Sequence, residues 1–410
     1  MGKVVVTGLG VVSPIGVCVP AFREALFAGR SGIGPLTTVP TDRLSVRVAA
    51  EVRGYAPEDH FDPRRLALLD RISQFAVVAA REAVAMAGLA FSGSLAARTA
   101  TVLGVGVGGI GTLDDSFHRL YAEQAARLHP FTIPRLMVSA PASHVTMEFG
   151  LTGPAFTASS ACASAGHALA TALMLLRAGM ADVVVSGGTD APLTLGTLKG
   201  WEAMRIVSPD TCRPFSRDRS GMVVGEGAAV LVLESEEHAR ARGAAVLAEL
   251  AGAGMSADAR DLTAPDAEGA ARAMRLALDD AGLDAEDVPY INAHGTATAA
   301  NDATEAQAIH AVFGGHARRL MVSSSKSMLG HALGAAGALE AVATVLALRH
   351  GVVPPTANFT EPDPACPVDA VPNEARSVPI RAALSNSFAF GGLNAVLAFR
   401  RVPDGPAGFP

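Results

Sequence analysis

One cysteine stands where a reactive thiol could be presented. The stretch TASSACASAGHALATALMLL, residues 157 to 176, places Cys162 among Ala, Ser and Gly, directly before a long apolar run. The preceding AFTASS indicates a short strand, and residues 161 to 178 are typical of a helix whose first turns carry small side chains. A helix N-terminus favours a thiolate and lowers the thiol pKa. A free cysteine is also a common core residue, so an inert buried thiol remains the alternative.

The other three cysteines carry no comparable signal. Cys18, Cys212 and Cys366 lie far apart, and no CxxC pair occurs, which excludes a zinc ribbon and argues against a disulfide framework in a chain of this size. We therefore expect a reducing, cytoplasmic environment.

Two histidines end predicted strands among small residues. In NAHGTATAANDATEA (292 to 306), His294 lies at the carboxyl end of a strand, where open α/β sheets bind ligands. In SSSKSMLGHALGAAG (323 to 337), a Ser-rich turn with Lys326 precedes His331 and a helix of small residues. A metal site is a poor interpretation because no third ligand stands at a usual spacing. Each histidine taken alone is equally compatible with a structural and a functional role.

A glycine pair after Phe390 forms the fourth element. In SNSFAFGGLNA (385 to 395), two glycines allow a tight turn whose backbone N–H groups could serve as an oxyanion hole. A plain hairpin between the last two strands is the compatible alternative. GVGVGGIG has the GxGxxG spacing, but no acidic residue follows about twenty positions on, so we do not predict a dinucleotide site. No GxSxG elbow is present, which argues against a serine hydrolase.

Composition narrows the class of protein. The chain has 410 residues, a net charge of -6 and 50% hydrophobic residues, and its basic residues are scattered, so we expect a large buried core and no nucleic-acid binding. The N-terminal MGKVVVTGLGVVSPIG is interrupted by Gly and Pro and indicates a buried strand, not a signal peptide. The longest apolar runs end at Arg177 or Glu340, short of the roughly 20 residues that span a bilayer.

The elements that must position these residues follow an α/β pattern. Short β-branched runs such as KVVVTGLGVV, DVVVSGG and RLMVSSSK alternate with Ala-rich amphipathic stretches, which predicts parallel sheets covered by helices on both sides. The pattern runs twice: each half begins with a strand that contains Gly and continues to a helix ending in AMAGL or LDDAGL. We predict two similar halves, residues 1–243 and 244–402, and a frayed tail at 403–410.

Four ordered motifs resemble one enzyme family. ACASAGHA, HGTATAANDATEA, KSMLGHALGAAG and SNSFAFGGLNA, in this order and at these separations, resemble the β-ketoacyl-(acyl carrier protein) synthases that extend fatty-acid and polyketide chains. The resemblance covers nearly the whole chain. It implies the thiolase-like duplicated fold, five-layered αβαβα with two similar halves, and decarboxylative condensation of malonyl-acyl carrier protein with a cysteine-bound acyl group.

The resemblance also implies roles for individual residues. Cys162 would accept the acyl group, and His294 and His331 would stabilise the enolate left when malonyl thioester loses CO2. Lys326 would set the electrostatics of the site, paired with Glu305. The remaining implied residues are Thr296 and Thr298 for the phosphopantetheine arm, and Phe390 as a gate whose N–H joins that of Cys162 in the oxyanion hole. No cofactor and no metal are implied, and the partner is an acyl carrier protein.

The chain departs from the family in the gate loop and matches one branch more narrowly. Gly-Phe-Gly-Gly-Thr-Asn is usual, whereas Ala389 and Leu393 stand here at the first and fifth positions. KGWEAMRIVSPDTCRPFSRDRSG together with GGLNA resembles the synthases of aryl-polyene and highly reducing type II polyketide pathways. In those systems the synthase pairs with a chain-length factor, so a heterodimer competes with a homodimer.

The sequence argues against two other functions. A thiolase needs a second cysteine in the C-terminal glycine loop, and none occurs at 385–395; a chain-length factor, a non-catalytic partner subunit, lacks the residue found here as Cys162. DPRRLALLDRIS offers Arg64, Arg65 and Arg71, which at helical spacing predict a basic face for the carrier protein. A solvated helix face is the equal alternative.

Overall fold

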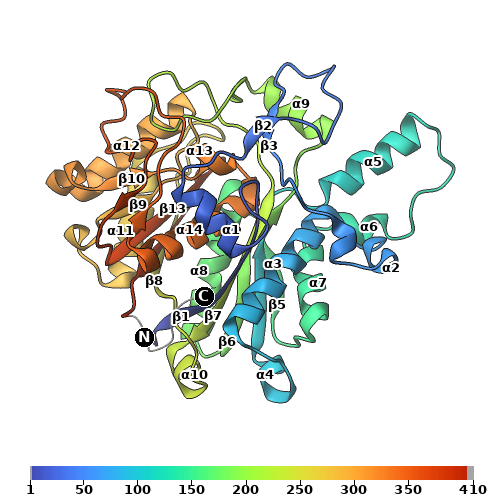
Figure 1. Ribbon diagram of the computed structural model, residues 1–410, viewed down its shortest axis with the longest axis horizontal. Coiled ribbons are helices and arrows are strands. Elements are labelled where there is room, and N and C mark those ends of the chain that lie inside the picture. Colours follow the sequence, from blue (N-terminus) through green and yellow to red (C-terminus); the bar gives the residue numbers. More distant parts are fainter. Residues whose placement is uncertain (1, 404–410) are drawn as a thin grey trace.

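A ten-stranded mixed sheet organises the chain. The computed structural model describes residues 2–403, so most of the predicted tail lies outside the described residues. Figure 1 shows the two halves of the chain, blue to green and yellow to red, on either side of the sheet centre. The strands run in the order β10-β9-β13-β14-β8-β1-β7-β6-β4-β5. Their bounds are β1 Val4–Val12, β4 Thr99–Gly104, β5 Ala155–Ala158, β6 Val183–Asp190, β7 Gly227–Ser235, β8 Ala248–Ala257, β9 Tyr290–Asn292, β10 Met321–Ser323, β13 Ala382–Ala389 and β14 Leu393–Arg400.

The strand order is the same in both halves when each is followed outward from the centre. β1, β7, β6, β4 and β5 correspond to β8, β14, β13, β9 and β10. In the first half β4 is parallel to β5 and β6, while β7 is antiparallel to β6 and β1. In the second half β9 is parallel to β10 and β13, while β14 is antiparallel to β13 and β8. The predicted duplication is therefore confirmed, and the halves join where β1 pairs with β8.

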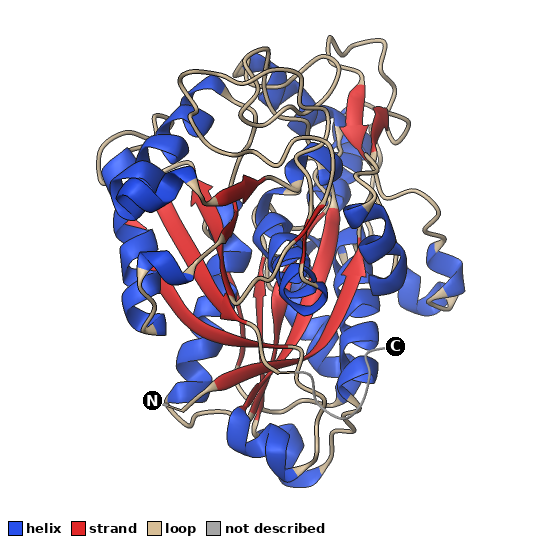
Figure 2. Ribbon diagram, turned by 60° about the vertical axis from the view of Figure 1, so that its left-hand side comes forward, coloured by secondary structure: helices blue, strands red, loops and turns tan. Residues whose placement is uncertain are grey.

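Helices form three layers, and the two groups of strands into which the sheet fans form the other two (Figure 2). α3 (Arg71–Ala87) and α7 (Ala140–Phe149) cover the outer face of the first half, and α11 (Ala267–Ala281) and α12 (Ala299–Phe313) cover that of the second. α8 (Ser164–Arg177) and α14 (Ala336–His350) contact strands of both halves, so they form the central layer. Figure 2 shows the strands fanning into two groups with helices between and outside them. This is the predicted five-layered arrangement.

The repeated glycines have two structural causes. A Cβ on Gly10 would lie 1.9 Å from the carbonyl oxygen of Ala79 in α3, and one on Gly254 would lie 2.0 Å from that of Ala273 in α11. Only glycine lets each outer helix rest directly on its strand. The glycines of AMAGL and LDDAGL end α3 and α11 in the left-handed region, with φ of 64° and 58°.

The remaining elements are short or peripheral. They are α1 Val19–Phe27, β2 Ile33–Pro35, β3 Val48–Ala50, η1 Pro57–Asp59, α2 Pro63–Leu66, α4 Gly93–Ala97, α5 Ile110–Tyr121, α6 Thr132–Leu136, η2 Ala161–Ala163, α9 Leu195–Ala203, α10 Glu236–Ala241, η3 Ala285–Asp287, η4 Gly314–Arg318, α13 Lys326–Leu329, η5 Leu333–Ala335, β11 Val352–Val353 and β12 Arg376–Ser377. The boundary predicted at residue 243 falls in the loop between α10 and β8.

Two strands are shorter than the sequence indicates. β9 stops at Asn292, two residues before His294, because the chain leaves the sheet there to form the His294 loop. β10 likewise stops at Ser323, before the Lys326 turn. Among the described residues, one helical stretch, Leu333–His350, is long and apolar enough to cross a membrane by length and composition, and 89% of it is buried inside the protein.

Candidate active site

Cys162 lies in a tight turn between β5 and α8. The helix begins at Ser164, two residues later than the cysteine, and a single 3₁₀ turn, η2, carries the thiol. The residue before it, Ala161, has a φ of 50°, so the backbone is bent sharply at this point. The small residues that follow are required by close packing, because a Cβ on Gly166 would lie 2.9 Å from the Cβ of Ala395.

The thiol is buried, and this overturns the expected direction of its pKa. Cys162 is 7% exposed, and burial raises its pKa to about 12. The positive charge of Lys326 acts in the opposite direction, while the carboxylates of Asp190 and Glu340 raise the pKa further. The helix terminus predicted to favour the thiolate is outweighed by desolvation, so the resting side chain is a neutral thiol.

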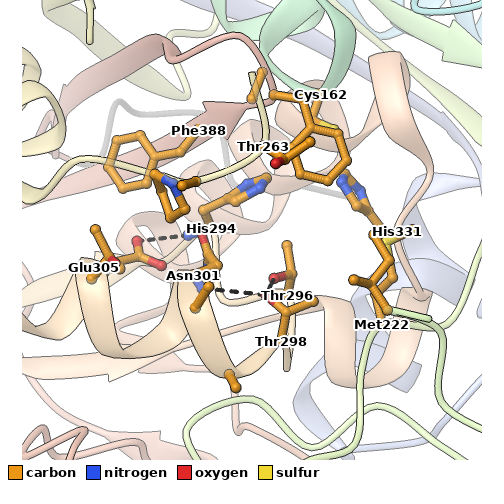
Figure 3. A pocket seen from close by; sticks show the side chains of 18 of the residues that line it. Cys162, Met222, Thr263, His294, Thr296, Thr298, Asn301, Glu305, His331 and Phe388 are labelled. Carbon is orange, nitrogen blue, oxygen red and sulfur yellow. Dashed lines mark hydrogen bonds between the residues drawn. The ribbon is translucent and has the colours of Figure 1, made fainter. Parts of the chain in front are cut away.

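His294 and His331 are brought together from β9 and from the turn after α13. Their rings lie with centroids 5.4 Å apart at 83°, and both are almost fully buried. Burial, with the charge of Lys326, holds the pKa of both imidazoles well below the usual value. Both are therefore neutral near pH 7. Figure 3 shows both rings and Cys162 directed toward the same cavity.

The backbone on either side of the histidines is fixed by hydrogen bonds. The N–H of His331 donates to the carbonyl of Val223 at 2.7 Å, and the carbonyl of His331 accepts from Gly225 at 2.9 Å. Glu305 in α12 accepts the N–H groups of His294 and Gly295, both at 2.8 Å, as Figure 3 shows for His294. The buried carboxylate of Glu305 thus fixes the backbone of the His294 loop.

Lys326 is paired with Glu340 and not with Glu305 as predicted. Its ammonium forms a buried ion pair with Glu340 in α14 and donates to the carbonyl oxygen of His294 at 2.7 Å. It also lies 3.2 Å from Nδ1 of His294. An ammonium can only donate, so Nδ1 accepts and the imidazole proton sits on Nε2. Glu340 was missed as a site residue, although a lone acid in the apolar run GALEAVATV is a signal for a buried charge pair.

Asp302 supports the segment that follows His294. Its carboxylate accepts the N–H of Phe215 at 2.7 Å and that of Ala297 at 3.1 Å, and Ala297 has a φ of 64°. The hydroxyls of Thr296 and Thr298 are 2.9 Å apart, and Thr298 also caps α12 through the N–H of Asn301. Both threonines line the cavity.

The glycine loop is both a hairpin and part of the cavity wall. β13 and β14 pair up to Ala389 and Leu393, and Gly391 and Gly392 turn the chain with φ of 81° and 67°. The N–H of Gly391 donates to the carbonyl of Leu262 at 2.7 Å. Asn394 donates to Asp258 at 2.7 Å, which ties the hairpin to the 258–265 segment.

Two aromatic contacts in this region were not predicted. The ring of Phe390 stacks on Trp201 of α9, with centroids 6.2 Å apart at 30°. The ring of Phe388 packs edge-on against His294 at 6.0 Å. Nothing in the local sequence pairs Trp201 with Phe390, because the two residues lie far apart in the chain.

These groups surround one cavity of about 380 Å³. It is lined by Cys162, His294, Thr296, Thr298, His331, Phe390, Trp201 and Met222, among others. Within residues 2–403 no group of three or more His, Cys, Asp and Glu side chains is arranged to hold a metal ion. A buried thiol beside two neutral imidazoles can act as a nucleophile, with ring N–H groups available to a developing negative charge.

The basic face predicted at Arg64, Arg65 and Arg71 is not one helix face. Arg64 and Arg65 lie in α2 and Arg71 begins α3, with a turn between them. Arg71 forms an ion pair with buried Glu226 at 2.7 Å, and Arg65 pairs with Glu148. Of the three, Arg64 alone is exposed. The helical spacing was misleading because the segment breaks at Ala67–Asp70.

Comparisons with known proteins cover up to 98% of the chain. Residues 1–239 match the family model "Beta-ketoacyl synthase, N-terminal domain" and residues 247–360 match "Beta-ketoacyl synthase, C-terminal domain". "Nodulation protein E" of Rhizobium sp. (strain N33) is 50% identical over 400 residues, 98% of this chain and 99% of that protein. "3-oxoacyl-[acyl-carrier-protein] synthase 2" of Staphylococcus aureus (strain N315) is 42% identical over 406 residues, 97% and 98% of the two chains. A solved structure, "The ishigamide ketosynthase/chain length factor", superposes with a TM-score of 0.93 at 39% identity, covering 98% of this chain and 100% of that one.

Proposed function

Since this chain belongs to the β-ketoacyl synthase family and is a β-ketoacyl-acyl carrier protein synthase, we propose that Cys162 holds the growing acyl chain as a thioester. The Sγ atom attacks the carbonyl carbon of an acyl thioester, the bond to the pantetheine sulfur breaks, and the Cys162 proton leaves with that thiol. The N–H groups of Cys162 and Phe390 stabilise the oxyanion of this step. The carrier-bound arm then departs, and a malonyl thioester replaces it.

The histidine pair serves the second step. The malonyl group loses CO2, the electron pair of the broken bond forms an enolate, and the ring N–H groups of His294 and His331 donate to its oxygen. The enolate carbon attacks the acyl carbonyl, the bond to Cys162 breaks, the Cys162 thiolate takes up a proton from water, and the β-ketoacyl product leaves on the carrier protein. The observation that carries this proposal is the Lys326 contact to Nδ1 of His294, because it leaves the proton on Nε2.

The carrier arm and the gate account for further residues of the cavity. We assign the hydroxyls of Thr296 and Thr298 to the amides of the phosphopantetheine arm, because both line the cavity. Phe390 is assigned as the gate, since its ring stands in the cavity wall on a loop that two glycines make adjustable. No cofactor enters these steps, because the pantetheine arm arrives on the carrier protein.

The partners are an acyl carrier protein and a second subunit of the same fold. β5 is the outermost strand of the sheet, and Phe156 in it is 41% exposed, which leaves an apolar sheet edge. Because one structural relative is "The ishigamide ketosynthase/chain length factor", we propose a heterodimer with such a subunit, and a homodimer is the alternative. The same likeness supports a polyketide pathway, and an aryl-polyene product stays a prediction.

One experiment tests this function. The purified protein and the Cys162→Ala variant are incubated with saturated and polyunsaturated acyl-carrier-protein thioesters, and the intact mass of each is measured. We expect the wild type to gain the mass of the acyl group and the variant to gain none. Acylation that persists in the variant would refute the proposal, and the acyl group transferred fastest identifies the pathway.

A further inference from the structure

A buried carboxylate below the cavity joins the two halves of the chain. Asp190 is the last residue of β6 and is fully buried. Its Oδ2 atom accepts the N–H of Gly106 at 2.9 Å and that of Gly334 at 2.7 Å, and Oδ1 accepts the N–H of Val107 at 3.3 Å. Gly106 and Val107 follow β4 in the first half, whereas Gly334 lies in η5 of the second half.

The packing around the Asp190 carboxylate leaves no room for a side chain at position 106 or 334. A Cβ on Gly106 would lie 2.6 Å from Oδ2 of Asp190, and a Cβ on Gly334 would lie 2.6 Å from the same oxygen and 2.2 Å from the nitrogen of Gly106. This close approach explains one glycine of the GVGVGGIG segment. Gly106 is required because two backbone segments and one carboxylate meet there.

The same carboxylate stands next to both catalytic turns. Gly334 is three residues after His331, and the residue between Ala332 and Gly334, Leu333, is held at a φ of 45°. The η5 turn contacts η2, which carries Cys162. Asp190 does not line the cavity, so it acts through its neighbours and does not touch the substrate.

We propose that Asp190 is a positioning residue: it holds the turn after His331 against the turn of Cys162, and its negative charge opposes formation of the Cys162 thiolate. This inference rests on the proposed role of Cys162. The charged groups that face the pair are Asp70 on the side of Asp190, and Lys326 and Glu340 on the side of Cys162. Burial raises the pKa of Asp190 to about 7, so its charge appears within the accessible pH range.

The sign of the effect follows from this titration. Below pH 6 Asp190 is neutral and does not oppose ionisation of the thiol, and above pH 8 it is charged and does. The rate at which iodoacetamide alkylates Cys162 follows the thiolate fraction. In the wild type this rate should therefore rise less than tenfold per pH unit across pH 7. His294 and His331 do not titrate there, because their pKa values lie well below 6.5.

The test compares Asp190→Asn with the wild type from pH 5.5 to 9, and the alkylation rate of Cys162 itself is measured by mass spectrometry of the peptide that contains it. We expect the two rates to converge below pH 6 and the variant to be about tenfold faster above pH 8, which corresponds to about one unit of thiol pKa. A looser turn that only exposes the thiol would give a ratio that is the same at every pH, and this result would overturn the charge role. Glu82→Gln is the matched control, since Glu82 also accepts two backbone N–H groups, those of Val11 and Val19, away from the site.

A second readout tests the positioning role. We expect Asp190→Asn to lower kcat for condensation about tenfold and to leave KM for the malonyl carrier unchanged, because one amide oxygen cannot accept all three N–H groups. An unchanged kcat would overturn this role. If Asp190→Asn is not recovered folded, Asp190→Ser is put through both assays with the same outcomes. Alkylation needs no carrier protein, so the two proposals can fail separately. Acylation of Cys162→Ala would refute the proposed function, whereas an alkylation ratio that does not change with pH would refute the charge role of Asp190.

Discussion

The two halves use the same backbone turn for different purposes. In the first half β5 leads through η2 into α8, and in the second half β10 leads through α13 and η5 into α14. The residue that begins each 3₁₀ turn has a positive φ, 50° at Ala161 and 45° at Leu333. The next residue is Cys162 in one half and Gly334 in the other. One copy presents a thiol, and the other presents a backbone N–H to Asp190.

This difference shows where the polar side chains of the second half are located relative to its 3₁₀ turn. Its turn has no space for a side chain, and its polar groups stand before the turn instead, at Lys326 and His331 in an inserted segment. His294 follows β9, whose counterpart in the first half, β4, ends in Gly104. A duplicated scaffold can therefore bring a buried thiol and two imidazoles together without either copy containing both.

Moving the thiol from one turn to the other gives the largest expected effect. We expect Cys162→Ala to lower condensation by at least about a thousandfold, because the acyl-accepting atom is lost. Adding Gly334→Cys should not restore it, since a Cβ at Gly334 would lie 2.2 Å from the nitrogen of Gly106. Product formation followed by mass spectrometry measures both. Recovery of activity in the double variant would contradict the difference drawn between the two turns.

Removing a histidine should separate the two steps. We expect His294→Ala or His331→Ala to lower malonyl decarboxylation about a hundredfold, the loss typical of one oxyanion donor, while Cys162 is still acylated. CO2 release and intact mass measure the two steps on the same samples. His118→Ala, at an exposed histidine on α5, is the control and should leave both unchanged. Equal losses in both steps would argue against a role confined to the enolate.

The buried pair of the second half should show in stability. We expect Lys326→Met to lower the free energy of unfolding by about 3 kcal/mol, because Glu340 would be left as an unpaired buried charge. The double variant with Glu340→Leu should regain most of this loss. Lys199→Ala, which breaks an exposed pair with Glu202, should cost no more than about 0.5 kcal/mol. Urea unfolding measures all three, and an unchanged midpoint in Lys326→Met would exclude the pair as a stabilising element.

A smaller effect is expected at the gate. The chain has one tryptophan, and Trp201 stacks on Phe390, so its fluorescence reports on the position of that ring. We expect acylation of Cys162 to change the emission in the wild type and to leave it constant in Phe390→Ala, with kcat lowered less than about tenfold. Cys162→Ala, which is not acylated, is the control. The same change in Phe390→Ala would show that Trp201 senses something other than the gate.

No effect is expected from mild acid on the decarboxylation step. The pKa values of His294 and His331 lie well below 6.5 because both rings are buried near Lys326, so neither gains a proton between pH 8 and pH 6. Because the pKa of Asp190 lies in the same range, CO2 release is measured in Asp190→Asn, where it should be flat. Stability behaves differently: the unfolded chain takes up these protons as pH falls through about 6.5, so the folded state loses stability below that pH. A drop in CO2 release centred near pH 6.5 would contradict neutral, buried histidines.

The sequence predicted local features, such as turns and the ends of strands and helices, better than it predicted which side chains from distant segments form pairs. Glycines that end strands and helices indicated the duplication, and small residues around Cys162, His294 and His331 indicated buried turns. The partner of Lys326 was wrong because Glu340 and Glu305 are both acids in neighbouring motifs, and only the fold decides which carboxylate points at the ammonium. The predicted direction of the Cys162 pKa shift was wrong, because the burial that raises this pKa comes from the tertiary fold and not from the local sequence. Asp190 carried no sequence signal, since its three partners come from two distant segments.

The two central helices have a joint electrostatic consequence. α8 and α14 both begin at the contact of η2 and η5, so their N-termini point toward one place from opposite halves of the chain. Each N-terminus carries about half a positive elementary charge. Their fields add at the point where the halves meet, in a site with little water to screen them. Duplication has thus given the protein a stronger field for negative charge than either copy could supply by itself.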